Sequence, residues 1–136
     1  MQEAYQELAE RSLLAARRLL EGDLHELAGF CCYHAYESSA SALAVRLSKP
    51  HGKKVPNHRR KLHIFLECVP KSNRQVRDQV RQLNLLLGSA RDNFLYPTEE
   101  DEELRQPREH LDHEQIERLI GDVEQVVEWV GHQIRS

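Results

Sequence analysis

The stretch 113–134, HEQIERLIGDVEQVVEWVGHQI, carries the clearest structural signal in the chain. Its apolar residues recur at steps of three and four, which places them on one face of an amphipathic α-helix. Asp112 and Gln115 match the capping box that begins many helices. The residues expected on the buried face of this helix are Ile116, Leu119, Ile120, Val123, Val126, Val127, Val130 and Ile134.

The same helical period continues in the first third of the chain. One stripe, ending at Gly22, is formed by Tyr5, Leu8, Ala9, Leu13, Ala16, Leu19 and Leu20. Gly22 is expected in the left-handed conformation that closes helices, and Asp23 is expected to cap a second helix, with Glu26 completing a capping box. The second helix is predicted from Leu24 to about Ser48. Its expected apolar face comprises Leu27, Cys31, Ala35, Ala42 and Val45.

The middle of the chain alternates loops and helices. Residues 50–57 are predicted to form a loop in which Asn57 caps a short helix that ends at Pro70. Ser72 is the expected cap of a longer helix, whose stripe is Val76, Val80, Leu83 and Leu87. Residues 97–111 hold two prolines and an acidic run, and they are predicted to form a solvated connection. Since no strand pattern competes, we expect an all-α protein: one domain, 1–136, built as an up-down four-helix bundle with an additional short helix.

Composition excludes several functional classes. The 136 residues carry 19 Lys and Arg against 22 Asp and Glu, a net charge of -3, which is unlike a strongly basic nucleic-acid arm. Three cysteines, two of them adjacent, form no disulfide or zinc pattern. The N-terminal residues show no signal peptide, and no apolar run is long enough to cross a membrane. We therefore expect a cytoplasmic protein, and no cofactor is indicated.

A basic segment stands out against this acidic background. Residues 46–61 contain seven Lys or Arg, and no acidic residue occurs from Ser38 through Leu66. Cations gathered in this way can contact RNA phosphates, whereas the simpler alternative is a solvated loop balanced by the acidic run at 99–103. The candidate RNA-binding residues are Lys53, Lys54, Arg59, Arg60 and Lys61.

Three other patterns could carry chemistry. Arg91, Asp92 and Tyr96 are expected to cluster where Pro97 ends a helix, the alternative being an exposed ion pair beside a half-buried tyrosine. His34 and Glu37 lie three residues apart on the second helix and can hydrogen-bond, most simply as part of a polar interface. A third pattern is the pair His110 and His113, which straddles a predicted helix start and has no third ligand nearby in the sequence. We assign no metal site to this pair.

The order of these segments resembles the HEPN domain family over about residues 9–134. The likeness rests on the aromatic and small-residue run Tyr33-His34-Ala35-Tyr36-Glu37-Ser38-Ser39-Ala40, on the basic, His-containing loop 51–61, and on an Arg followed after four residues by an aromatic residue before the last helix. That final element is Arg91 and Tyr96, with Asp92 at the polar position that often follows the Arg. Where this family has His, the present chain has Tyr96.

The resemblance implies an all-α bundle that forms a homodimer. In active members the Arg and His of two protomers line a cleft and cut RNA without metal, so the implied catalytic residues are Arg91, Tyr96 and Asp92. A tyrosine with an ordinary pKa near 10 is a poor base at neutral pH, so we expect weak or absent catalysis. The leading hypothesis is therefore an RNA- or partner-binding module of toxin–antitoxin or defence type, with a nucleotidyltransferase as a partner of some relatives. The alternatives are a metal-independent endoribonuclease and a structural interaction bundle.

Overall fold

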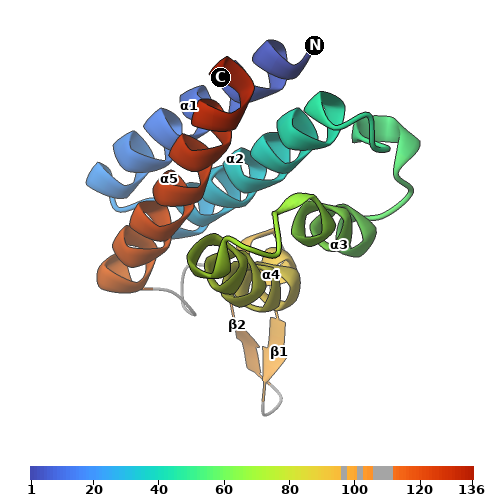
Figure 1. The fold of residues 1–136 in the computed structure, drawn as a ribbon. Coiled ribbons are helices and arrows are strands. Elements are labelled where there is room, and N and C mark those ends of the chain that lie inside the picture. The colour runs from blue at the N-terminus through green and yellow to red at the C-terminus, as the bar shows by residue number, and fades with distance from the viewer. Residues whose placement is uncertain (96–97, 101–102, 106–111) are drawn as a thin grey trace.

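The described part of the chain contains five α-helices, one short 3₁₀ helix and a small hairpin (Figure 1). The computed structural model describes residues 1–95, 98–100, 103–105 and 112–136, and it describes only the backbone of residues 91–95, 98–100 and 103–105. The elements are α1 (Gln2–Glu21), α2 (His25–Arg46), η1 (Gly52–Lys54), α3 (His58–Cys68), α4 (Arg74–Leu95), β1 (Thr98–Glu100), β2 (Glu103–Arg105) and α5 (His113–Arg135).

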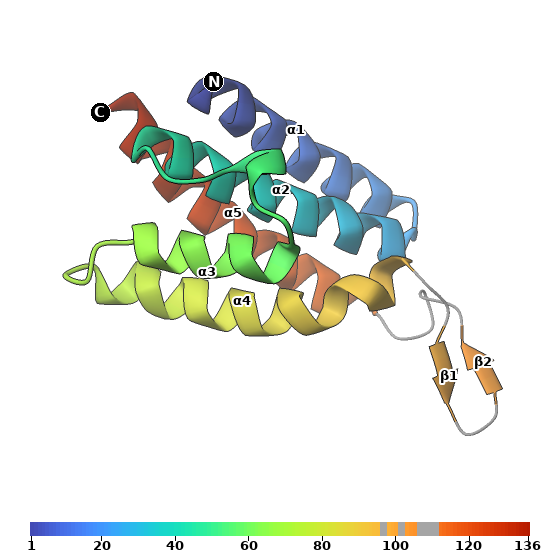
Figure 2. The same ribbon diagram turned by 90° about the vertical axis from the view of Figure 1, so that its right-hand side faces the viewer.

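The helices form two layers. Helices α1, α2 and α5 lie side by side, and the α3–α4 pair crosses beneath them, so that Figure 1 shows α3 and α4 almost end-on while the other three run across the view. Figure 2 shows the length of the α3–α4 pair. Helix α2 contacts all four other helices and forms the centre of the fold. The predicted all-α bundle with one shorter helix is confirmed.

The connection between α4 and α5 contains structure that the sequence did not predict. Strands β1 and β2 pair antiparallel, with Thr98 opposite Arg105 and Glu100 opposite Glu103. The absence of strands expected from the sequence is therefore wrong at these positions, while the solvated character of the connection stays a prediction. Charged residues are poor strand formers, so their composition carried no strand signal. The hairpin projects from one end of the helices in Figure 2.

The final helix matches its prediction closely. All eight apolar residues expected on its inner face are buried, including Val126 and Val130 with no exposed surface. The Asp112 carboxylate accepts a hydrogen bond from the Gln115 backbone, and the Gln115 side chain accepts one from the Asp112 backbone. This reciprocal cap satisfies two backbone donors that helix geometry leaves without partners.

Helix α2 buries a different set of residues from the predicted stripe. Ala35 and Ala42 are buried as expected, but Leu27 is 45% exposed. Cys32 and Tyr36 are fully buried instead. A single apolar stripe suits a helix with one solvent face, whereas α2 is covered by neighbours on several sides. Its small-residue run, residues 38–42, is buried throughout, as expected for a place where other helices approach closely.

Two predicted helix caps are wrong. Asp23 does not cap α2, which begins at His25 without a side-chain cap, and Asp23 itself holds the left-handed conformation (φ 59°) that was expected of Gly22. Aspartate tolerates this conformation better than most residues because its short side chain can bond locally. Asn73, rather than Ser72, caps α4 by accepting a hydrogen bond from the Val76 backbone at 3.2 Å.

A buried glutamine holds α1 against α5. The Gln6 side chain is 3% exposed and donates a hydrogen bond to the Val127 carbonyl at 3.1 Å. Opposite it stands Gly131, where a Cβ atom would lie 3.0 Å from the Gln6 side-chain nitrogen. The glycine therefore makes room for a polar contact between the two ends of the chain.

Candidate nucleic-acid interface

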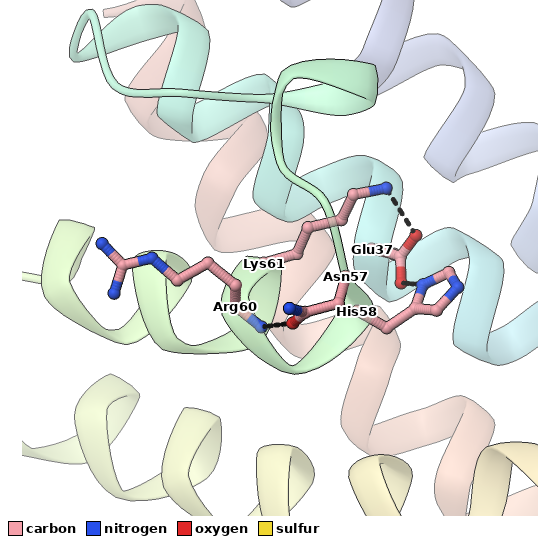
Figure 3. A network of polar contacts seen from close by, with 5 residues as sticks. All are labelled: Glu37, Asn57, His58, Arg60 and Lys61. Carbon is pink, nitrogen blue, oxygen red and sulfur yellow. Dashed lines mark hydrogen bonds and ion pairs between the residues drawn. The ribbon is translucent and has the colours of Figure 1, made fainter.

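The predicted RNA-binding residues lie on two neighbouring elements. Lys53 and Lys54 belong to η1, while Arg59, Arg60 and Lys61 occupy the first turns of α3. Asn57 caps α3 as predicted, because its side-chain oxygen accepts a hydrogen bond from the Arg60 backbone at 2.7 Å (Figure 3). The cap fixes where α3 begins and hence the direction in which its first side chains leave the helix.

The cations differ in how far they are already engaged. Lys53, Lys54, Arg59 and Arg60 are exposed. Within the described part of the chain, no carboxylate lies within ion-pair distance of these four residues. Lys61 instead donates to the Glu37 carboxylate at 3.2 Å, with its side chain only 20% exposed. We call the four exposed cations the basic surface, and we exclude Lys61 from it.

Glu37 organises the start of α3 from its position on α2. Its carboxylate accepts hydrogen bonds from His58 Nδ1 at 2.6 Å and from Lys61 Nζ at 3.2 Å (Figure 3). Tyr33, one turn earlier on α2, also bonds to it. We call these four residues the Glu37 network. The anticipated pairing of Glu37 with His34 is not what the described contacts show, since His34 is exposed and Glu37 turns toward α3.

The charge of Glu37 is stabilised despite its burial. Burial by itself would raise the pKa of this carboxyl group, but the hydrogen bonds from His58 and Tyr33 and the charge of Lys61 outweigh that effect and lower the pKa. The carboxylate therefore stays ionised at neutral pH and holds His58 in one orientation. The Tyr33 and His58 rings meet edge to face, with centroids 5.9 Å apart, which orients the imidazole further.

An open groove of about 630 Å³ begins at this network and runs between α3 and α4. Its lining residues are Tyr33, His58, Arg59, Leu62, His63, Leu66, Asn84, Leu85, Gly88 and Ser89. Asn84 ties its walls together, because its amide donates to the Leu62 carbonyl at 2.9 Å and accepts from the Tyr36 hydroxyl at 2.7 Å. No sequence pattern pointed to Asn84 or to the α4 wall, since these contacts join residues far apart in the chain.

A smaller hollow on the other side of α3 links Lys61 to the loop before η1. Pro50 and His51 line this hollow together with Lys61, and they also line a second, larger hollow with Lys49 and Lys54. The His51 ring packs edge to face against Tyr5 of α1, with centroids 5.9 Å apart. The loop is thereby tied to the bundle, which gives its cations a defined position.

The structure describes the predicted catalytic residues only in part. The backbones of Arg91 and Asp92 are helical, in the last turns of α4, but their side chains lie outside the described residues. Tyr96 lies outside the described residues altogether. Ser89 is the last residue of α4 that lines the groove, and Arg91 follows it by two residues, so the Arg91 backbone lies within one helical turn of the groove.

Comparison with known proteins now identifies the fold. The chain belongs to the HEPN domain family, because the model of the HEPN domain matches residues 2–133. A crystal structure described as an archaeal HEPN homologue superposes with a TM-score of 0.68, covers 98% of each chain and is 20% identical. At this identity the likeness shows a shared fold. No curated protein gives a significant match. Within the described residues, no helix is long and apolar enough to cross a membrane.

Proposed function

We propose that this HEPN-domain protein binds single-stranded RNA across the basic surface and the adjoining α3–α4 groove. The observation that carries the proposal is the exposure of Lys53, Lys54, Arg59 and Arg60, without carboxylate partners among the described residues, in a protein whose net charge is -3. These four cations fall within eight residues of the chain, in a stretch without acidic residues, and such a cluster favours a polyanionic ligand.

The groove supports a single strand over a duplex. Its walls combine apolar side chains, Leu62 and Leu85 among them, with the half-exposed imidazole of His58 and the guanidinium of Arg59. Unstacked bases bind against aromatic and guanidinium planes, whereas base-paired RNA offers no such free faces. The proposed division of labour is that the basic surface holds phosphates while the groove accepts one or two bases.

The proposal extends to a homodimer in which Arg91 and Asp92 contribute to the RNA-binding cleft. The position of the Arg91 backbone, two residues after the groove residue Ser89, supports this, as does membership of the HEPN family. With Tyr96 in place of histidine, we propose that cleavage is slow and that binding is the main activity. A base near neutral pKa is what efficient attack by the ribose 2′-hydroxyl requires.

Salt dependence of binding tests the proposal directly. Fluorescence anisotropy of a labelled oligoribonucleotide should give an affinity that falls steeply with salt. A plot of the logarithm of the association constant against the logarithm of the salt concentration should have a slope of about -2.8 if all four cations contact phosphates of a single strand. The double variant Arg59→Gln/Arg60→Gln should weaken binding and reduce the size of the slope by about 1.4.

The matched control removes the same charge from the opposite side of the protein. Arg11 and Arg18 are exposed residues of α1, and Figure 2 shows α2 lying between α1 and α3. The double variant Arg11→Gln/Arg18→Gln should keep the wild-type slope. Equal losses of RNA affinity in the two double variants would mean that only the net charge of the protein matters, which would contradict the proposed site. Wild-type RNA binding that does not change with salt would contradict it as well.

A further inference from the structure

Three potential metal ligands from distant parts of the chain meet at one end of the bundle. Asp23 lies in the turn between α1 and α2, His25 is the first residue of α2, and His113 is the first residue of α5. Their ligating atoms all lie within 4.8 Å of one another. Figure 1 shows this turn and the start of α5 at the same end of the helices. A chain separation of nearly ninety residues makes the grouping a product of the tertiary fold.

The donor set suits a transition metal. Two imidazoles and one carboxylate bind Zn²⁺ in catalytic sites and Fe²⁺ in facial triads, and both leave positions open to water. A tetrahedral ion with bonds of about 2.0 Å needs ligand atoms roughly 3.3 Å apart. His25 Nε2 and Asp23 Oδ1 are 3.8 Å apart, and rotation of the side chains brings them within reach.

One of these ligand atoms lacks a satisfying contact. His25 Nε2 is buried, and within the described residues it has no hydrogen-bond partner, the Asp23 carboxylate being too distant for one. The His25 and His113 rings meet edge to face with centroids 6.0 Å apart, so this contact positions the rings without satisfying the nitrogen. A buried nitrogen without a partner costs free energy, and a metal bond removes that cost.

The helix dipoles oppose a cation here, but weakly. Both histidines stand at helix N-termini, where the partial positive charge of the helix disfavours a cation modestly. The acidic residues Glu26 and Glu114 in the first turns of the same helices offset this. Direct coordination by two imidazoles and a carboxylate is stronger than this screened dipole effect. The coordination bonds therefore decide whether an ion binds.

We propose that Asp23, His25 and His113 form a binding site for a divalent transition-metal ion such as Zn²⁺. The bound ion clamps the α1–α2 turn to the start of α5, immediately after the connection that leads back from α4. Burial raises the pKa of Cys31, Cys32 and Cys68, which disfavours the thiolate form in which a cysteine binds metal.

Calorimetric titration of untagged, metal-stripped protein with Zn²⁺ tests the site. We expect one ion per chain, and Zn²⁺ at a hundred times its dissociation constant should raise Tm by on the order of 5 °C or more. His25→Gln and His113→Gln should each weaken binding at least tenfold. Asp23→Asn, which keeps a side chain suited to the left-handed conformation, should also weaken binding.

Two exposed histidines outside the cluster provide matched controls. His63 is paired with Glu67 on α3, and His132 lies near the end of α5. His63→Gln and His132→Gln should bind Zn²⁺ like the wild type. Absence of saturable binding, equal loss in the control variants, or a thiolate charge-transfer band with Co²⁺ would each overturn the proposal. Far-ultraviolet circular dichroism of the metal-free variants separates lost ligands from lost folding.

Discussion

The sharpest prediction concerns Glu37, which joins α2 to α3. Replacing it by Gln keeps the shape of the side chain and removes its charge. The side chains of Glu37 and Lys61 are only 12% and 20% exposed. Removing one charge of such a buried pair destabilises the fold more than removing one charge of an exposed pair, because the remaining charge is left without its partner. A hydrogen bond to a charged group contributes about 1.5–3 kcal/mol, and the amide oxygen retains part of one such bond. We expect Glu37→Gln to lower the free energy of unfolding by about 2 kcal/mol.

Chemical denaturation at pH 7 measures this loss, and it should accompany a fall in Tm of roughly 8 °C. Glu67→Gln is the matched control, because Glu67 also bonds a histidine, His63, at 3.0 Å on α3. Both partners there are more than half exposed, and such pairs contribute no more than about 0.5 kcal/mol. Losses of equal size in the two variants would refute the importance assigned to burial.

The pH dependence provides a second test of the same reasoning. Since the folded state lowers the pKa of Glu37, its ionised form stabilises the protein above the ordinary glutamate pKa of about 4.3. This contribution is lost as the pH falls through the lowered, folded-state value. The stability difference between wild type and Glu37→Gln should therefore persist from neutral pH to about pH 5 and shrink below about pH 4. A difference that stays constant with acidification would contradict the argument.

Three further predictions follow from the core and from the proposed cleft. Val126 has no exposed surface, so Val126→Asp should abolish cooperative unfolding, as seen by circular dichroism, while a folded variant would contradict the assigned core. Sedimentation at micromolar concentration should show a homodimer, and a monomer at every concentration would remove that part of the proposal. Tyr96→His introduces a base with an ordinary pKa near 6.5 and should increase RNA cleavage in a gel assay. Tyr96→Phe should not increase cleavage. Loss of cleavage in Tyr96→Phe would instead show that the tyrosine hydroxyl is catalytic.

Helices with one buried face were largely predictable, although Leu8, placed on the predicted stripe of α1, is 41% exposed. Val76, Val80, Leu83 and Leu87 of α4 are all buried, as their spacing requires. The prediction was poorer for α2, where Leu27 is exposed. Apolar residues repeat every 3.6 positions when one face of a helix is buried and the opposite face is exposed to solvent. A central helix such as α2 has little exposed face, so the repeat is weak.

The candidate site could be predicted only in its composition. The basic character of residues 53–61 is visible in the sequence. The ion pair that Lys61 forms with Glu37, which removes Lys61 from the exposed cations, is not visible there. Likewise, the groove wall contributed by Asn84 and Gly88 has no local signature. The predicted roles of Arg91, Asp92 and Tyr96 stay predictions, because their side chains lie outside the described residues.

The features that could be read from the sequence are local ones: the helices, the Asn57 and Asp112 caps, and the segments that resemble the HEPN family. Hydrogen bonds three and four residues apart and the period of apolar side chains decide such features within one or two turns. The tertiary structure alone decided that Glu37 faces His58, and that His113 meets His25. Those meetings depend on how whole helices pack, because the burial of their shared apolar faces brings distant polar groups together as a consequence.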